Sequence, residues 1–403
     1  MAMQHTPLLM SNILDRGATV APYEEIVTLT ESGVRRQTYR ETRDRAHQLA
    51  HALAGSGIKV GDRVGTFMWN GSRHLEAYHA VAGMGAVLHT LNVRLSPKDL
   101  EYIINHAEDQ IIIVDADVLP LLEVLNGKIP CVRKVVVATE EGFEGWSTEL
   151  PDPVDYEAFI EGQPTYFDWP QIDENSPMGL CYTSGTTGNP KGVEYEHRSQ
   201  YLHTLTQCMT DSMGLTGTDT VCGIVPMFHA MGWGIPWSAL MLGCKQVMPH
   251  RFMDPARLLD LMVAEEVTLS AGVPTIWQGV KGLYEANPDA YDLSALSRLT
   301  CGGSSPPPSL IRWFWDELDV EMIQGWGMTE TSPTGTVLAA EDSVRKIGSA
   351  GKPALHTSIK IVDKNLSQVK SNDIGELLIK GPNITPGYWQ NEDATNNSFQ
   401  EGW

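Results

Sequence analysis

The segment from Tyr182 to Gly192, YTSGTTGNPKG, gathers glycines, hydroxyl side chains and one lysine in a single short stretch. Glycine lets a backbone turn sharply and bring its N–H groups close to an anion. The hydroxyls add hydrogen-bond donors, and Lys191 adds a positive charge suited to phosphate. The segment does not fit the G-x-x-x-x-G-K-S/T pattern, which excludes the usual P-loop NTPase. We therefore predict a different kind of phosphate-binding loop, formed by Thr183, Ser184, Gly185, Thr186, Thr187, Gly188 and Lys191.

The residues on either side indicate how this loop is positioned. A short apolar run from Met178 to Cys181 comes before it, and the residues after it favour a helix. We therefore expect the loop to connect a strand to a helix.

Helix-like and strand-like segments alternate through the first part of the chain. Thr38 and Glu41 have the spacing of a capping box, which predicts the start of a helix. Ser96 before Pro97 predicts a second helix start. The run Ile111–Val114 is apolar without interruption, as in a parallel strand covered on both faces. This alternation predicts an α/β fold.

A chain of 403 residues is too long for one hydrophobic core, so two or three packed units are expected. We predict a first α/β subdomain over residues 1–177 and a second over 178–342, both with largely parallel sheets. Residues 343–403 should form a small β-rich subdomain, because Ile359–Val362 and Gly375–Lys380 resemble short strands between turns. The boundaries are approximate, and the subdomains are free to interlace.

Composition narrows the function classes. A formal charge of −21 disfavours general attraction to nucleic acid or to an anionic membrane surface. The six cysteines lack a CxxC pair, which favours reduced thiols in a cytoplasmic protein. The uncharged run Thr220–Cys244 is interrupted by Pro226, Gly232 and His229, so it is interpreted as a pocket lining. We expect no nucleic-acid partner and no stable membrane insertion.

Four motifs together resemble the adenylate-forming superfamily, which includes acyl- and aryl-CoA synthetases, luciferases and peptide-synthetase adenylation domains. The loop at Tyr182–Gly192 is similar to that superfamily's phosphate-binding signature. Gly302–Pro306 resembles its adenine turn, and Gly325–Glu330 resembles its motif for adenine, α-phosphate and metal. Gly375–Gly381 with Gly387–Trp389 resembles its β-rich third subdomain, a distorted barrel.

The resemblance implies roles for the nucleotide-binding residues. The phosphate loop would hold the departing pyrophosphate, and Thr329 would donate to the α-phosphate. Glu330 would hold Mg²⁺ together with Thr186, since this hard cation prefers oxygen ligands. Trp326 stands where a tyrosine is commonest in the superfamily and offers a larger stacking face. Outside the loop, the implied nucleotide-binding residues are Gly302, Gly303, Ser304, Ser305, Pro306, Gly325, Trp326, Gly327, Met328 and Thr329.

A further segment, Pro226–Trp233, resembles the border of the superfamily's acid pocket. His229 would lie near the substrate carboxylate, and Trp233 corresponds to an aromatic residue that closes the acyl tunnel in fatty-acyl-CoA ligases. The alternative for both is plain core packing. Gly272, Val273 and Pro274 would supply another pocket wall. The residues implied to be catalytic are Thr186, Lys191, His229, Thr329 and Glu330.

The resemblance favours an acid–CoA ligase that uses ATP, Mg²⁺ and coenzyme A. Its acid would be a short- or medium-chain fatty acid or 3-methylmercaptopropionate. The alternatives are an acyl-AMP ligase that loads a carrier protein, and a non-catalytic nucleotide-binding fragment. A homodimer stays open as the assembly. The resemblance also implies a ribose-binding Asp, a hinge and a C-terminal lid domain with a lysine beyond Trp403, and we expect these to be absent from residues 1–403.

Overall fold

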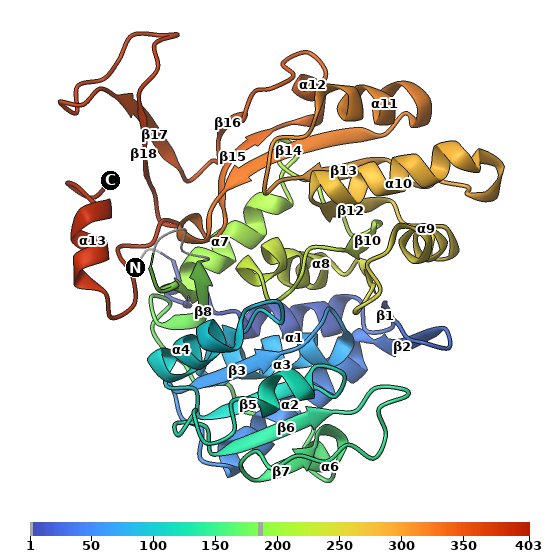
Figure 1. Cartoon of the computed structure of the whole chain (residues 1–403), viewed down its shortest axis with the longest axis vertical. Helices are drawn as coiled ribbons and strands as arrows, with labels where there is room; N and C mark the ends of the chain where they lie inside the picture. The colour runs from blue at the N-terminus through green and yellow to red at the C-terminus, as the bar shows by residue number, and fades with distance from the viewer. Residues whose placement is uncertain (1–2, 184–187) are drawn as a thin grey trace.

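The computed structural model describes residues 3–183 and 188–403. Within these residues the strands form a seven-stranded sheet, a nine-stranded sheet and a two-stranded ribbon. Figure 1 shows helices packed against the two larger sheets, one at the bottom of the view and one at the upper right. The predicted α/β fold with largely parallel sheets is confirmed.

The seven-stranded sheet has the order β7-β6-β5-β3-β4-β8-β9, and all its neighbours are parallel except the pair β8 and β9. Its strands are β3 (Arg63–Phe67), β4 (Val87–Thr90), β5 (Ile111–Asp115), β6 (Lys134–Ala138), β7 (Pro153–Asp155), β8 (Pro177–Thr183) and β9 (Lys191–Glu196). The helices of this region are α1 (Ser11–Val20), α2 (Tyr39–Gly55), α3 (Ser72–Gly83), α4 (Pro97–Ala107), α5 (Leu119–Glu123) and α6 (Tyr156–Ile160).

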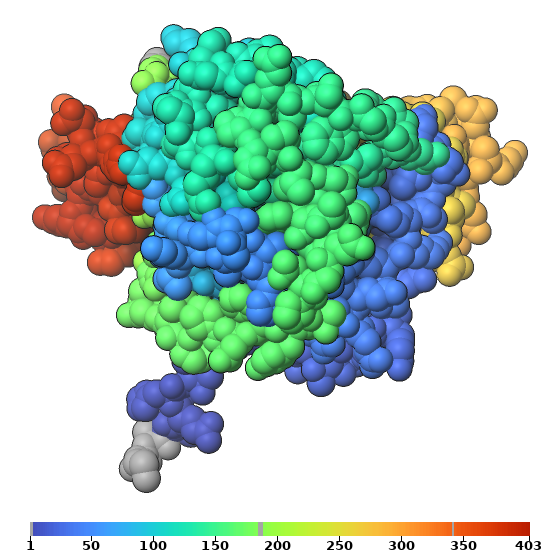
Figure 2. All heavy atoms as spheres, turned by 90° about the horizontal axis from the view of Figure 1, so that it is seen from below, coloured from blue at the N-terminus to red at the C-terminus, as the bar shows by residue number. Residues whose placement is uncertain are grey.

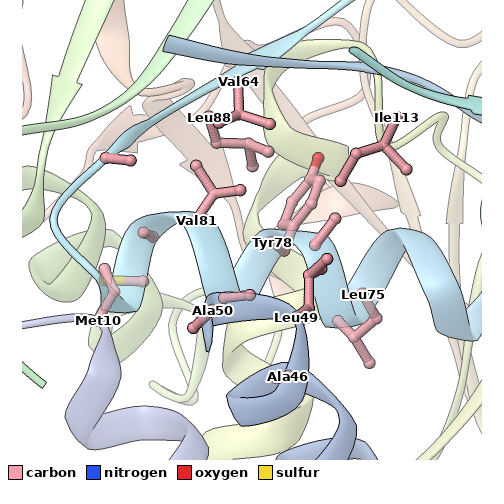
Figure 3. Packing of buried hydrophobic residues seen from close by; sticks show 14 of the residues in the cluster. Met10, Ala46, Leu49, Ala50, Val64, Leu75, Tyr78, Val81, Leu88 and Ile113 are labelled. Atoms are coloured by element: carbon pink, nitrogen blue, oxygen red, sulfur yellow. The ribbon is translucent and has the colours of Figure 1, made fainter. Parts of the chain in front are cut away.

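Strand β5 shows why a continuous apolar run is needed in this sheet. Ile111 and Ile113 belong to the core that includes α2 and α3, whereas Ile112 and Val114 belong to the core that includes α4 and α5. Both faces are therefore buried, as the sequence predicted. In Figure 3, Tyr78 of α3 lies among these packed side chains, between the strands and helix α2.

Both predicted helix starts are confirmed. Thr38 caps α2, and its side chain and that of Glu41 form the reciprocal bonds of a capping box. The Ser96 hydroxyl accepts a hydrogen bond from the Asp99 N–H at 3.2 Å, and Pro97 is the first residue of α4. Each arrangement satisfies N–H groups that a helix start leaves unpaired.

The nine-stranded sheet has the order β16-β15-β14-β13-β12-β10-β11-β1-β2. Its strands are β1 (Glu25–Leu29), β2 (Val34–Thr38), β10 (Thr220–Gly223), β11 (Lys245–Met248), β12 (Leu269–Gly272), β13 (Arg298–Cys301), β14 (Glu321–Gly327), β15 (Thr334–Leu338) and β16 (Lys352–Pro353). The six strands from β14 to β1 are parallel to one another, and β2, β15 and β16 pair antiparallel. The helices of this region are α7 (His197–Gln207), α8 (Ile235–Leu242), α9 (Pro255–Ala264), α10 (Pro274–Ala286), α11 (Pro308–Leu318) and α12 (Ala340–Ser343).

The carboxyl-terminal residues, red in Figure 2, lie to one side of the main body. They include the antiparallel ribbon β17 (Ser358–Val362) and β18 (Glu376–Lys380), followed by α13 (Glu392–Ser398). Both strands occur where the sequence predicted them. The barrel form and the subdomain boundaries stay predictions, and the sheets interlace: β1 and β2 join the second sheet, whereas β8 and β9 complete the first. No helix in the described ranges is both long and apolar enough to cross a bilayer.

Asn70 ties the two large sheets together. It follows β3 of the first sheet, is 1% exposed, and reaches the chain that leaves β10 of the second sheet. Its Nδ2 donates to the carbonyl oxygens of Gly223 at 2.8 Å and Val225 at 2.7 Å. Its Oδ1 accepts from the Met227 N–H at 2.7 Å. One side chain thus fixes three backbone groups of the segment that leads to His229.

Replacing Asn70 by Leu should lower the free energy of unfolding by about 3 kcal/mol or more, because three buried backbone groups lose their partner. The matched control is Asn105→Leu, since Asn105 lies nearer the surface and bonds to one backbone group, from Nδ2 to the Lys128 carbonyl at 2.8 Å, besides a weak bond that its Oδ1 accepts from Cys131 Sγ at 3.4 Å. It should cost less than about 1 kcal/mol. Urea denaturation measures both; equal losses would contradict this role of Asn70.

Candidate active site

The candidate site lies beyond the carboxyl ends of four adjacent parallel strands. Strands β10, β12, β13 and β14 are neighbours in the sheet, so the segments that follow them emerge at one edge. The chain passes from β10 to β11 on one side and then to β12 on the other, which makes β10 a point of topological reversal. Ligands of open α/β sheets bind in the crevice at such a point.

A cavity of about 290 Å³ occupies this edge. Predicted site residues that line it are Thr183, His229, Trp233, Gly302, Gly303, Gly325, Trp326, Gly327, Met328, Thr329 and Glu330. The four sequence motifs that supply them are far apart along the chain, and the fold brings them around one hollow.

Other predicted residues lie outside the cavity lining. Lys191 begins β9, and the loop residue Gly188 precedes it. Ser304 and Ser305 are exposed beyond the Gly303 turn, and Pro306 is buried. Gly272, Val273 and Pro274 adjoin that turn, since the Gly302 N–H donates to the Gly272 carbonyl at 3.3 Å. Ser184, Gly185, Thr186 and Thr187 lie outside the described residues.

The prediction that this loop connects a strand to a helix is wrong. The residues after Lys191 form strand β9, which pairs antiparallel with β8, and helix α7 begins only at His197. The reason is that the side chains of this segment alternate between the two faces of the sheet: Val193 and Tyr195 are buried, whereas Glu194 and Glu196 are less buried. The loop therefore connects two antiparallel strands.

Glu330 lies in the short helical turn η3 (Thr329–Thr331) and is held from the carboxyl-terminal region. The Tyr388 hydroxyl donates to Glu330 Oε1 at 2.7 Å, and the Thr385 N–H donates to the Glu330 carbonyl at 3.0 Å. The ammonium of Lys191 lies 4.8 Å from the centre of the Tyr388 ring. Tyr388 therefore contacts both the predicted metal ligand and the predicted phosphate lysine.

Tyr388 remains a proton donor at neutral pH. Burial, with a further contribution from its bond to Glu330, raises the pKa of Tyr388 to about 12. Sequence reasoning noticed Tyr388 only as part of a likeness in the third subdomain and gave it no place in the site. The Gly-Tyr-Trp triplet was the available signal, but nothing in the sequence indicates that it contacts Glu330.

The surroundings of Glu330 suit an Mg²⁺ ligand. Among the described residues Glu330 forms no ion pair, and its hydrogen-bond partner Tyr388 is neutral. Within the described residues no ion pair therefore occupies the carboxylate oxygens beside the cavity, and oxygen is the ligand atom that Mg²⁺ prefers. The predicted second ligand, Thr186, lies outside the described residues.

Other atoms pack closely against two glycines, Gly327 and Gly335, near the part of the cavity that Trp326 lines. A Cβ on Gly327 would lie 1.7 Å from the Pro333 carbonyl oxygen, so only glycine fits there. A Cβ on Gly335 would lie 2.5 Å from the Trp326 indole, which shows that the indole packs directly on the Gly335 backbone. The indole is half-buried and borders the cavity.

His229 stands exposed at the cavity, after a turn in which its N–H donates to the Pro226 carbonyl at 2.9 Å. The protein atoms packed around the ring lower the pKa of His229, and the positive charge of Arg94 lowers it further. The imidazole is therefore neutral at physiological pH and can act as a hydrogen-bond donor or acceptor to a ligand.

Several cavity residues were missed by sequence reasoning. They come from the end of α7 and the turn after it, and from strands β13, β14 and β15. They include Gln207, Ser212, Met213, Thr300, Ile323, Thr334 and Val337. The sequence carries no signal for them, because each belongs to an ordinary helix, turn or strand and reaches the cavity only through the packing of these elements.

A separate buried group, Asp115, Glu140 and His250, brings its possible ligand atoms within 4.8 Å of one another. However, Glu140 pairs with Arg73 at 2.8 Å and with Arg35 at 3.2 Å. Two guanidinium charges beside the carboxylate repel a metal cation. We assign this group to a structural ion-pair network.

The fold is α/β with a cavity at the carboxyl ends of its parallel strands, and comparison with known families identifies its class. The family described as AMP-binding enzyme matches residues 14–389, and the chain belongs to this family. The predicted membership in the adenylate-forming enzymes is confirmed.

Among its relatives, the long-chain-fatty-acid–CoA ligase of Thermus thermophilus is 40% identical over 409 residues, covering 98% of this chain and 73% of the ligase. The 3-methylmercaptopropionyl-CoA ligase of Ruegeria lacuscaerulensis is 37% identical over 413 residues, covering 100% of this chain and 76% of the ligase. The solved structure of the anthranilate CoA ligase AuaEII with anthranoyl-AMP has a TM-score of 0.88 at 25% identity, covering 100% of this chain and 76% of that chain.

Gly325 and Gly327 belong to one motif but differ in how closely other atoms approach them. Gly327→Ala should lower the free energy of unfolding by about 3 kcal/mol, because the new methyl group meets a backbone carbonyl that cannot move aside. Gly325→Ala is the control, since a Cβ at Gly325 has no atom within 4 Å among the described residues. It should change stability by less than about 1 kcal/mol in urea denaturation. Similar losses for both variants would mean that the close approach at Gly327 is unimportant.

Proposed function

We propose that this chain carries the ATP and acid sites of an AMP-forming acid–CoA ligase. The observation that carries the proposal is the single cavity in which Thr329 and Glu330 of one motif meet His229 and Trp233 of another. A nucleotide and a carboxylic acid placed side by side is the arrangement that acid activation requires.

The reaction follows from the poor reactivity of a carboxylate. A carboxylate oxygen attacks the α-phosphorus of ATP, the bond between the α-phosphorus and the bridging oxygen breaks, and pyrophosphate leaves. The product is an acyl-adenylate. The sulfur of coenzyme A then attacks the acyl carbon, and AMP leaves as the acyl-CoA forms. Both steps need charge-stabilising groups in a site sheltered from water.

The cavity lining supports the proposed roles of Thr183, His229, Trp326 and Thr329, whereas Lys191 lies outside the lining and beside Tyr388. Trp326 with the Gly302 turn would contact adenine, Thr329 would donate to the α-phosphate, and His229 would bind near the acid carboxylate. Thr183 and Lys191, at the two ends of the phosphate loop, would bind the departing pyrophosphate.

Glu330, with Thr186, would hold Mg²⁺. The cation would supply positive charge to the phosphate oxygens. Tyr388 would keep the Glu330 carboxylate oriented, given its 2.7 Å hydrogen bond to Oε1.

The acid is proposed to carry an apolar tail. Met213, Ile323 and Val337 line the cavity together with Trp233. Relatives act on long-chain fatty acids and on 3-methylmercaptopropionate according to their names. We propose a short- or medium-chain fatty acid or 3-methylmercaptopropionate as substrate. A cytoplasmic location and a homodimeric assembly stay predictions.

The decisive experiment is an acid panel, from butyrate to dodecanoate with 3-methylmercaptopropionate, assayed for pyrophosphate and CoA-dependent AMP release by the full-length enzyme. Release of both products with an acid of the proposed classes supports the function. Acyl-adenylate that reacts with a holo-carrier protein but not with coenzyme A would identify an acyl-AMP ligase. Nucleotide binding without pyrophosphate release from any acid would identify a non-catalytic module.

Glu330→Gln tests the proposed metal role. Removing the carboxylate charge should slow pyrophosphate release by about 100-fold or more, since it weakens the cation that stabilises the transition state. The fold should persist, because the amide oxygen can still accept from Tyr388. Glu317→Gln, an exposed change on α11, is the control and should leave the rate within about twofold. An unchanged rate in Glu330→Gln would exclude the assignment.

Trp233→Ala tests the acid-pocket role. The loss of an indole beside the cavity should shift the preferred acid chain length, because it opens space at the tail. The KM for ATP should change much less. Comparing kcat/KM across the acid panel measures the shift, and superimposable profiles for wild type and variant would mean that Trp233 is only a packing residue.

A further inference from the structure

The turn η1 (Ala230–Gly234), which carries Trp233 to the cavity, has an uncommon backbone. All five of its residues have positive φ: 45° at Ala230, 53° at Met231, 59° at Gly232, 54° at Trp233 and 78° at Gly234. Residues other than glycine rarely adopt this left-handed region, and a run of them is especially unfavourable. Contacts from the rest of the fold must therefore impose the turn.

Two side chains of helix α7 supply such contacts. His203 Nε2 donates to the Trp233 carbonyl at 3.0 Å, and Gln207 Nε2 donates to the same oxygen. The two side chains are only 1% and 4% exposed. Burial lowers the pKa of His203 to about 4, so the ring is neutral at physiological pH. Its Nε2 therefore carries the donated proton and leaves Nδ1 without one.

The packing leaves little freedom around this carbonyl. A Cβ on Gly234 would lie 2.5 Å from the His203 ring, so His203 packs directly against the turn. The Trp233 indole lies against the turn that begins at Gly302. A Cβ on Gly302 would lie 2.9 Å from Cη2 of the Trp233 indole. Any rotation of the Trp233 peptide would move the indole relative to Gly302 and change the width of the cavity.

We propose that His203 and Gln207 are positioning residues that determine which acids the enzyme accepts, by fixing the Trp233 carbonyl and thereby the indole. This inference rests on the proposed acid-activating function and extends it to residues outside the sequence motifs. Neither side chain needs to contact the reacting atoms. Gln207 also lines the cavity, so the part of its effect that passes through the left-handed turn is the part that requires the Trp233 indole.

The test uses Gln207→Leu, which keeps the size of the side chain and removes the donor. Loosening the indole should raise the ratio of kcat/KM for decanoate to kcat/KM for butyrate by about fivefold, as expected for one lost hydrogen bond. The KM for ATP should stay within about twofold. His203→Leu should shift the ratio in the same direction, and His203→Gln, which retains a donor, should restore most of the wild-type profile.

A double-mutant cycle separates positioning from general damage. In a Trp233→Ala background, adding Gln207→Leu should change the ratio by less than about twofold, because the side chain that it positions is gone. The control is Thr206→Val, since Thr206 is on the same helix and, within the described part of the chain, its hydroxyl bonds only to the Leu202 carbonyl, at 2.9 Å. It should leave the ratio unchanged.

Three results would overturn the proposal. One is an equal loss of kcat/KM for every acid in Gln207→Leu, and another is the same shift with and without Trp233. If Gln207→Leu does not fold, Gln207→Met takes its place with the same expectations. The third result is a wild type that releases no pyrophosphate with any acid, which would exclude the proposed function as well. If the wild type is active and the variants leave the chain-length profile unchanged, only the positioning role of His203 and Gln207 is excluded.

Discussion

The hydrogen bonds of Asn70 are the interaction on which the arrangement of the site depends. They attach the chain leaving β10 of one sheet to the end of β3 in the other. The Tyr78 hydroxyl, from the same sheet's helix α3, also donates to the Met227 carbonyl. Both polar backbone groups of Met227 are thus held by the first sheet. His229 lies two residues after Met227, so this attachment fixes the position of His229 at the cavity.

The second constraint is how a strongly acidic chain presents a site for ATP. A charge of −21 gives no general attraction to phosphate, so local groups must supply it. Lys191 and Glu330 are the charged groups proposed for this role, and Tyr388 contacts both. A neutral donor between them orients the carboxylate without cancelling its charge. The site therefore depends on the carboxyl-terminal region that supplies Tyr388 as well as on the two larger sheets.

The third constraint is that several positions in the motifs must be glycine, because the backbone there packs at distances that a side chain would prevent. Gly327 faces a backbone carbonyl, Gly335 faces the Trp326 indole, and Gly302 faces the Trp233 indole. The large aromatic rings and the small residues are therefore complementary. At these three positions glycine permits close approach, whereas Gly303, with φ of 77°, also supplies a left-handed backbone.

The sequence by itself determined the features that depend on neighbouring residues: the capping box at Thr38, the buried strand at Ile111, and the motifs that identify the family. It also indicated that Trp326 and His229 border one site. It did not determine that β9 follows the phosphate loop, that Tyr388 reaches Glu330, or that Gln207 bonds to Trp233. Local propensity and spacing act over a few residues, whereas Asn70 and Met227 are separated by 157 positions. Only the packing of the completed sheets brings such groups within hydrogen-bonding distance, and tertiary structure therefore decided these contacts.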